Sequence, residues 1–202
     1  IELIPCIQTL AHLATTLKWD YAAGMKDTPN TLLVGQEETY KFIYEMLSQL
    51  RKVFRTDRIH IGMDEAMDLG TGVYLRKYGA ADQFELMMVH LNRVTQMAQE
   101  LGWLPIIWDD MFYRSKSPDL EYYAPETVLT PEDIAKVPTN VQLVYWDYYH
   151  NTQAEYDCLL EKRKDLPNDL IFAGGIWKWN GWVPNYGKTF TATRAAMAAC
   201  RN

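Results

Sequence analysis

The segment Arg58–Glu65, RIHIGMDE, ends an apolar run in two adjacent acidic residues. Because side chains alternate along a strand, Asp64 shares one face with His60 and Gly62, and the three apolar residues face the other way. A strand alone therefore cannot direct both acids at one substrate. The pattern predicts that the strand stops after Asp64 and that the following loop turns Glu65 toward the same site.

Strand patterns and helix patterns alternate along the chain. Strands are expected over residues 1–7, 58–63, 104–108, 141–146 and 170–173, and helices over residues 36–54, 82–101, 152–164 and 191–200, with a further short helix opening at Pro131. Asp82, Thr130 and Thr152 are placed as N-caps, and Gly102 is placed to end the second long helix. This alternation is typical of right-handed βαβ units that form a parallel sheet.

The fold expected from these units is an α/β fold, a (β/α)8 TIM-type barrel, whose chemistry lies at the carboxyl ends of the strands. Such barrels typically need about 250 residues, whereas this chain has 202 and opens directly on a strand pattern. We therefore expect residues 1–202 to form a single catalytic barrel domain that is incomplete. One or two N-terminal strands would be absent, and the chain would be a fragment of a longer one.

Composition limits the partners. The formal net charge is −6 without a basic run, which argues against nucleic acid, and no apolar stretch reaches the roughly 18 residues of a membrane span. Cys6, Cys158 and Cys200 are too far apart for a disulfide framework or a metal clip. Charge and cysteine pattern together favour a bacterial cytoplasm. The oligomeric state is not predicted.

Aromatic and acidic residues recur at the other strand ends. They are Trp108 followed by Asp109 and Asp110, Tyr145 and Asp147 on one strand face, and Trp177 and Trp179 on another. Aromatic residues make up 13% of the chain, with seven Trp and thirteen Tyr. Rings against sugar C–H faces, with acids for hydroxyl groups and proton transfer, suit a carbohydrate ligand.

The stretch from His60 to Glu65 has the H-x-G-x-D-E form of glycoside hydrolase family 20, the β-N-acetylhexosaminidases. The pair Tyr145-x-Asp147 and the later Gly-Gly-x-Trp stretch at Gly174 follow in the order of that family. The resemblance covers most of the chain and is strongest to the shorter bacterial branch, whose third strand is similar to Ile4–Leu10.

The resemblance implies a retaining exo-enzyme that removes terminal GlcNAc or GalNAc, with the substrate's own acetamido oxygen as nucleophile. Glu65 would be the general acid and base, Asp64 would orient the acetamido N–H, and Tyr145 would bind the acetamido oxygen. The resemblance also implies residues that bind the substrate, namely His60, Trp108, Asp147, Trp177 and Trp179. No cofactor and no metal are implied.

Some features depart from the family pattern. The sugar-binding Arg of the first strand has no counterpart, Gln8 is nearest the place of a third-strand His, and His12 lies one helical turn further on. Tyr122 or Tyr123 could replace the middle Trp of the acetamido pocket.

Two alternatives stay open at this point. One is a non-catalytic carbohydrate-binding fragment of such a barrel. The other is a metal-dependent hydrolase that would draw its ligands from His60, Asp64, Glu65, Asp109 and Asp110.

Overall fold

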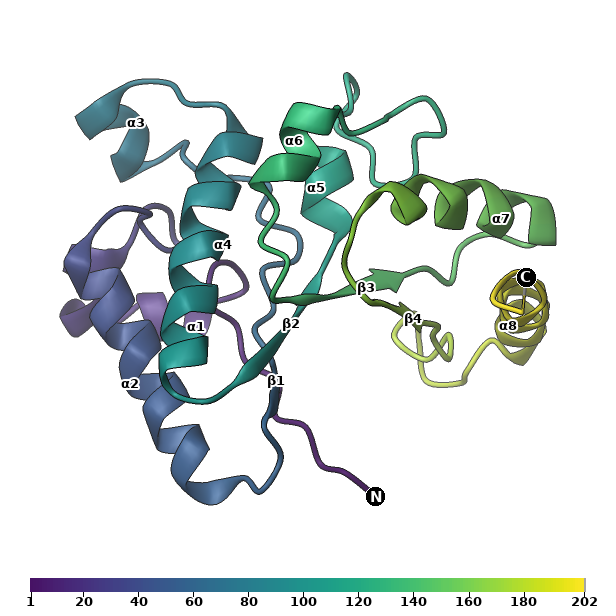
Figure 1. Cartoon of the computed structure of the whole chain (residues 1–202), viewed down its shortest axis with the longest axis horizontal. Coiled ribbons are helices and arrows are strands. Elements are labelled where there is room, and N and C mark those ends of the chain that lie inside the picture. The colour runs from purple at the N-terminus through teal and green to yellow at the C-terminus, as the bar shows by residue number, and fades with distance from the viewer. Residues whose placement is uncertain (202) are drawn as a thin grey trace.

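The computed structural model describes residues 1–201 and contains a four-stranded parallel sheet with its strands in chain order (Figure 1). The strands are β1 (Arg58–His60), β2 (Leu104–Trp108), β3 (Gln142–Trp146) and β4 (Leu170–Ala173). The α-helices are α1 (Ala14–Leu17), α2 (Glu37–Val53), α3 (Val73–Tyr78), α4 (Gln83–Glu100), α5 (Asp110–Arg114), α6 (Pro131–Lys136), α7 (Gln153–Glu161) and α8 (Tyr186–Ala199). Within residues 1–201, none of the helices has both the length and the apolar character that a membrane crossing requires.

The predicted helix ends are confirmed where a local capping signal exists. The side chain of Asp82 accepts the N–H of Glu85 at the start of α4, and Thr130 and Thr152 each form a reciprocal capping box at α6 and α7. Gly102, at a φ of +74°, follows the end of α4. Helix α8 lacks such a signal in the prediction and begins at Tyr186 instead of Thr191.

The strand expected over residues 1–7 is reduced to a single bridge. Cys6 pairs with His60 in parallel, with His60 N–H donating to Pro5 at 2.9 Å and Ile7 N–H donating to His60 at 2.9 Å. Ile1 and Leu3 are exposed because no strand lies beside them. The prediction of a strand along the whole segment was wrong, although the segment does pair with β1 at Cys6.

The structure thus confirms a parallel α/β architecture, and its four-stranded sheet agrees with the incomplete barrel that the sequence predicts. The sheet is flanked by α2 and α4 near β1 and β2, and by α7 and α8 near β3 and β4 (Figure 1). Two hydrophobic clusters follow this division. The larger includes Ile59, Ile61 and Leu91, and the smaller joins Tyr145 and Tyr156 to the alanines of α8.

A buried ion pair anchors β2 to the 3-10 helix Lys162–Asp165 that follows α7. Arg163 donates from two nitrogens to both carboxylate oxygens of Asp109, at 2.5 and 3.0 Å, and both side chains are buried. The guanidinium also lies over the rings of Tyr145 at 3.8 Å and Tyr113 at 4.5 Å. Two charges withdrawn from water in this way depend on each other, since neither has solvent as a substitute.

We expect Asp109→Asn to lower the free energy of unfolding by about 3–5 kcal/mol, because it leaves the buried guanidinium without its counter-ion. The matched control is Glu37→Gln, which breaks the exposed pair of Glu37 with Arg93 and should leave stability nearly unchanged. Urea unfolding followed by circular dichroism measures both. Equal losses in the two variants would contradict the structural role of the buried pair.

Candidate active site

The acid pair lies where the chain leaves β1 in an unusual backbone conformation. Gly62 and Met63 have φ values of +73°, and Glu65 has a φ of +49°. A Cβ at Gly62 would lie 2.2 Å from Oε1 of Gln8 and 2.8 Å from the carbonyl oxygen of Ile7, so only glycine fits there. Left-handed non-glycine residues are uncommon and occur preferentially at functional sites. The strand does stop before Glu65, as predicted, but it stops earlier, at His60.

Asp64 and Glu65 converge on one imidazole. Nε2 of His12 lies 3.2 Å from Oδ2 of Asp64 and 3.4 Å from Oε2 of Glu65. Gln8 holds the other oxygen of Asp64 by donating from Nε2 at 2.8 Å, and its own Oε1 accepts the N–H of Met63 at 3.2 Å. Adjacent acids thus reach one point because the backbone turns between them.

Asp110 supports this turn from the first residue of α5. One of its oxygens accepts the N–H of Glu65 at 3.0 Å, and the other, also buried, has no hydrogen-bond partner. Burial raises the pKa of Asp110 to about 7, and the charges of Asp64 and Asp109 act in the same direction. A carboxyl group that keeps its proton toward neutral pH can donate a hydrogen bond as well as accept one.

His60 and Trp108 pack against each other on the face of the sheet that His60 shares with Asp64 in the sequence pattern. Their ring centroids are 4.4 Å apart, and Nδ1 of His60 accepts the N–H of Gly62 at 3.1 Å. Burial lowers the pKa of His60 to about 4, against the opposing charge of Asp64, and Nε2 has no partner. The structure therefore brings these two predicted residues together with the acid pair, as neutral groups.

Tyr145 and Asp147 lie on the opposite face of the sheet. Tyr145 is fully buried in the cluster with α7 and α8, and its hydroxyl donates to Asp147 at 2.5 Å. Asp147 also pairs with Nδ1 of His150 at 2.6 Å. Both polar groups are occupied by protein partners, so the structure does not bring them to Asp64 and Glu65.

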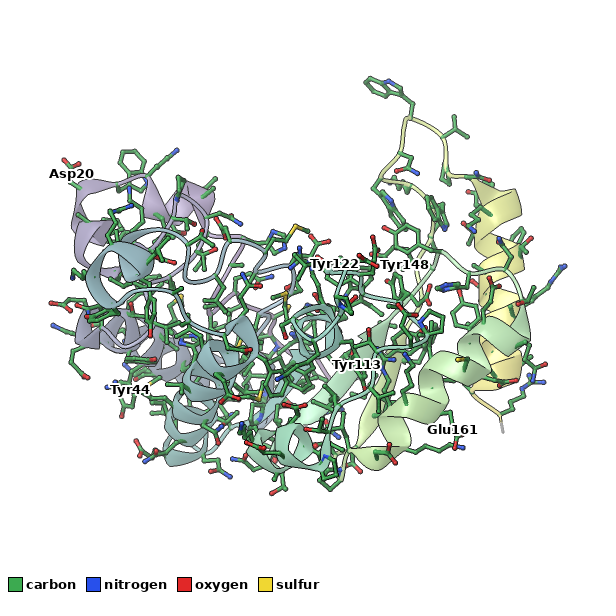
Figure 2. The ribbon with its side chains drawn as sticks, turned by 90° about the horizontal axis from the view of Figure 1, so that it is seen from above. Asp20, Tyr44, Tyr113, Tyr122, Tyr148 and Glu161 are labelled. Atoms are coloured by element: carbon green, nitrogen blue, oxygen red, sulfur yellow. The ribbon has the colours of Figure 1, made fainter. Side chains whose placement is uncertain are left out.

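Trp146 and Tyr148 lie on the other face of β3 and its extension, where Tyr122, from the segment between α5 and α6, packs against Trp146. Trp146 packs against Tyr148 with centroids 5.5 Å apart and against Tyr122 at 5.7 Å, and Figure 2 shows Tyr122 and Tyr148 close to each other. Burial, and with it the charges of Tyr149 and Glu65, raises the pKa of Tyr148 to about 12. The sequence signal was the alternation itself, which places Trp146 and Tyr148 together against Tyr145 and Asp147.

Trp177 and Trp179 continue this aromatic surface. Their rings are 5.0 Å apart, Trp179 lies 4.7 Å from Tyr148, and Nε1 of Trp177 donates to the carbonyl oxygen of Tyr148 at 2.7 Å. Trp177 is half-buried and Trp179 is exposed. Tyr148 thus links both tryptophans to the side of the sheet that carries the acid pair.

One family of known proteins matches the part of the chain that carries the acid pair. Residues 5–160 match the catalytic domain of glycosyl hydrolase family 20. The chain belongs to this family. Hexosaminidase D of Bos taurus is 29% identical over 188 residues, which cover 88% of this chain and 51% of that protein. Hexosaminidase D of Homo sapiens is 30% identical over 157 residues, which cover 73% of this chain and 30% of that protein.

Solved structures of the family share the fold of this domain. A β-N-acetylhexosaminidase from Bacteroides fragilis superimposes with a TM-score of 0.59 at 19% identity, over 88% of this chain and 32% of that one. An exo-β-N-acetylglucosaminidase from Vibrio harveyi, in complex with N-acetylglucosamine, gives 0.54 at 16% identity, over 85% and 25%. The family 20 domain described here thus spans about half the length of its bovine relative and less of the others. The bacterial cytoplasmic origin expected from composition stays a prediction.

Of the five metal ligands proposed from the sequence, two, Asp64 and Glu65, belong to the group of ligand atoms that could hold a metal among residues 1–201. His12, Asp64 and Glu65 each offer a ligand atom, and these atoms lie within 4.8 Å of one another. Asp109 instead pairs with Arg163, and His60 lies beneath Trp108. The five-residue metal centre is therefore not assembled, and His12 takes the place of its histidine.

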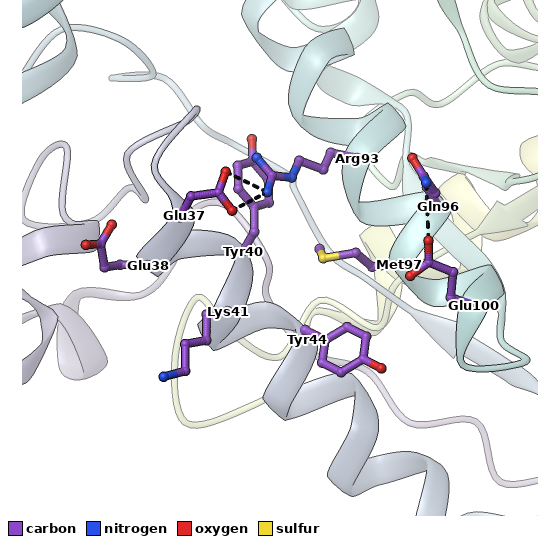
Figure 3. A pocket seen from close by; sticks show the side chains of 9 residues that line it. All are labelled: Glu37, Glu38, Tyr40, Lys41, Tyr44, Arg93, Gln96, Met97 and Glu100. Carbon is purple, nitrogen blue, oxygen red and sulfur yellow. Dashed lines mark hydrogen bonds and ion pairs between the residues drawn. The ribbon is translucent and has the colours of Figure 1, made fainter.

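A hollow of about 690 Å³ lies elsewhere, on the outer surface between α2 and α4 (Figure 3). Two of its charged groups are already paired, since Arg93 donates to both carboxylate oxygens of Glu37 at 2.8 and 2.6 Å and lies over Tyr40. The acid pair is the better candidate site because its two carboxylates converge on one point and the aromatic rings on the same side of the sheet remain accessible to a ligand.

The pKa of Asp110 predicts how stability depends on pH. The folded domain holds this proton to about pH 7, whereas the unfolded chain loses it near 3.8, so deprotonation destabilises the fold as pH rises from about 4 to 7. Asp110→Asn removes this loss of stability because the amide does not ionise, and its side-chain oxygen can still accept the N–H of Glu65. We expect it to be more stable than the wild type at pH 8, by at most about 4 kcal/mol, and equally stable at pH 4.

Thermal or urea unfolding at the two pH values measures this difference. The matched control is Asp20→Asn at an exposed acid, which should shift stability equally at both. A wild type that is as stable as the Asp110→Asn variant at pH 8 would show that Asp110 is ionised there without cost.

Proposed function

We propose that this family 20 domain carries the site of a retaining exo-β-N-acetylhexosaminidase that acts by substrate-assisted catalysis. The observation that carries the proposal is the convergence of Asp64 and Glu65 on Nε2 of His12, at 3.2 and 3.4 Å, at the carboxyl end of β1. In a parallel α/β barrel this is the end of the sheet where catalytic residues lie.

In the first step, the acetamido oxygen of the bound sugar attacks the anomeric carbon and the bond to the leaving oxygen breaks. Glu65 gives its proton to that oxygen, and Asp64 stabilises the positive charge that develops on the acetamido N–H. Electrostatic stabilisation of this kind is usually the largest contribution to catalysis. His12, within reach of both carboxyl groups, holds them in register.

In the second step, water attacks the anomeric carbon of the oxazolinium intermediate and Glu65, now ionised, takes up the proton. The ring opens back to the acetamido group, and two inversions give net retention. The single carboxylic acid serves as acid and then as base. The buried support of the Glu65 backbone by Asp110 keeps the carboxyl group in place through both steps.

Tyr148 is proposed as the hydrogen-bond donor to the acetamido oxygen, the role implied for Tyr145. Tyr148 lies on the acid-pair side of the sheet, and the charges of Glu65 and Asp64 reach its hydroxyl, while the hydroxyl of Tyr145 is committed to Asp147. Trp108, Trp177 and Trp179 would wall the sugar and its acetamido methyl group.

The substrate proposed is a glycoside with a terminal β-GlcNAc or β-GalNAc. The family match and the N-acetylglucosamine bound by the Vibrio harveyi neighbour support this class. A non-catalytic carbohydrate-binding role is the second candidate. The observation that favours it is the open sheet, since β4 has no pairing neighbour beyond it among the described residues.

Turnover of 4-nitrophenyl β-GlcNAc tests the proposal, with the matching β-glucoside as control. The wild type should hydrolyse only the acetamido sugar, and Glu65→Gln and Asp64→Asn should each lower kcat by about 100-fold or more. Hydrolysis of the β-glucoside at a similar rate would contradict substrate assistance. A folded wild type that binds GlcNAc in titration calorimetry without any turnover would favour the binding role.

The two tyrosines form a matched pair of variants. Tyr148→Phe should lower kcat on 4-nitrophenyl β-GlcNAc by about 10- to 100-fold, because one hydrogen bond that strengthens in the transition state is lost. Tyr145→Phe should keep kcat and lower the free energy of unfolding by about 1–2 kcal/mol, because buried Asp147 loses a donor. The opposite pattern would return the acetamido role to Tyr145.

A further inference from the structure

The acid pair and His12 form a set of three ligand atoms that meet from two separate segments of the chain. Nε2 of His12 lies 3.2 Å from Asp64 and 3.4 Å from Glu65, and the three ligand atoms all lie within 4.8 Å of one another. The side chains of His12, Asp64 and Glu65 are 40%, 20% and 36% exposed, so an ion can reach them from solvent.

The two short distances suit a tetrahedral metal. Zinc binds imidazole nitrogen and carboxylate oxygen at about 2.0–2.2 Å, so neighbouring ligand atoms of a regular zinc site lie roughly 3.3–3.5 Å apart. The distances from Nε2 to the two carboxylate oxygens, 3.2 and 3.4 Å, are close to these spacings, and the two oxygens lie within 4.8 Å of each other. One imidazole and two carboxylates also match the ligand types of open zinc sites, in which water takes the fourth position.

The groups around the three ligands hold them in position. Gln8 donates to Oδ1 of Asp64 at 2.8 Å, which leaves Oδ2 free to face His12. Asp110, only 4% exposed, accepts the N–H of Glu65 at 3.0 Å and so fixes the backbone of that ligand. Partners of this kind orient metal ligands and raise the affinity of a site.

We propose that His12, Asp64 and Glu65 bind one Zn²⁺ ion and that the ion inhibits hydrolysis. The ion binds the carboxylate form of Glu65, so the proton that Glu65 carries in the proposed mechanism leaves to solvent as the ion binds. Glu65 then has no proton to give to the leaving oxygen, and Asp64 no longer faces the acetamido group. Zinc and substrate compete for the same atoms. The inhibitory part rests on the proposed function, whereas the binding part does not.

Zinc binding is measured by competition with a chromophoric zinc chelator at pH 7.5. Exposed thiols are the main competing ligands. Cys6 lies close to the site, since partial burial and, to a smaller extent, the charge of Asp64 raise the pKa of its thiol. The titration therefore uses the full chain with Cys6, Cys158 and Cys200 all changed to Ser. One equivalent of zinc should bind this protein.

Two variants in that background locate the site. His12→Asn suits the φ of +57° at this position, because Asn tolerates the left-handed region, and Glu65→Gln keeps the shape of the acid. Each should weaken zinc binding by at least about tenfold, the loss that removal of even a supporting partner causes at metal sites. Glu37→Gln, at an exposed acid on α2, should bind as before. Binding that is unchanged in both site variants overturns the proposal.

Inhibition is measured on the thiol-free protein with 4-nitrophenyl β-GlcNAc. Zinc should raise KM without lowering kcat, and excess EDTA should restore the original KM. Zinc that lowers kcat at saturating substrate overturns the competitive mechanism. A protein without hydrolytic activity would contradict the proposed function alone, because the chelator titration still decides whether these three residues bind the ion.

Discussion

The left-handed turn after β1 is the constraint on which the site depends. Side chains of neighbouring strand residues point in opposite directions, so Asp64 and Glu65 can converge only where the backbone leaves the strand. Gly62 makes this possible because any side chain there would meet Gln8 and the Ile7 carbonyl. Asp110 and Gln8 then hold the two residues of the turn by hydrogen bonds to Glu65 and Met63. The segment that carries the acids is thus pinned from two other parts of the chain.

The same sheet separates chemistry from support by its two faces. His60 and Trp108 pack against each other on one face, where the charge of Asp64 acts on His60, whereas Asp109 and Tyr145 point toward the helices. There they meet Arg163, whose charge is balanced by Asp109 and whose guanidinium covers the ring of Tyr145. A buried acid and a buried hydroxyl therefore serve as structural partners, although in sequence they look like candidate site residues.

The negative charge of the acid pair also accounts for the uncharged groups that lie near it. Burial favours the uncharged form of His60 and of Asp110. Two carboxylates near one imidazole concentrate negative charge, and further ionised acids would raise its electrostatic cost. His12 is the residue that can compensate this charge directly. A cation drawn to the same point would replace the proton that the chemistry requires.

The sequence by itself determined the parallel α/β class, the two ends of α4, the starts of α6 and α7, and the motif that carries the acids. These features follow from local rules, namely hydrophobic periodicity, side-chain caps and the alternation of side chains along a strand. Only the tertiary structure decided that His12 completes the pair, that Tyr148 and not Tyr145 lies on its side, and that Asp109 is structural. Such outcomes depend on which face of a strand is covered by helices. That choice is made by packing between segments far apart in the chain, and no local pattern records it.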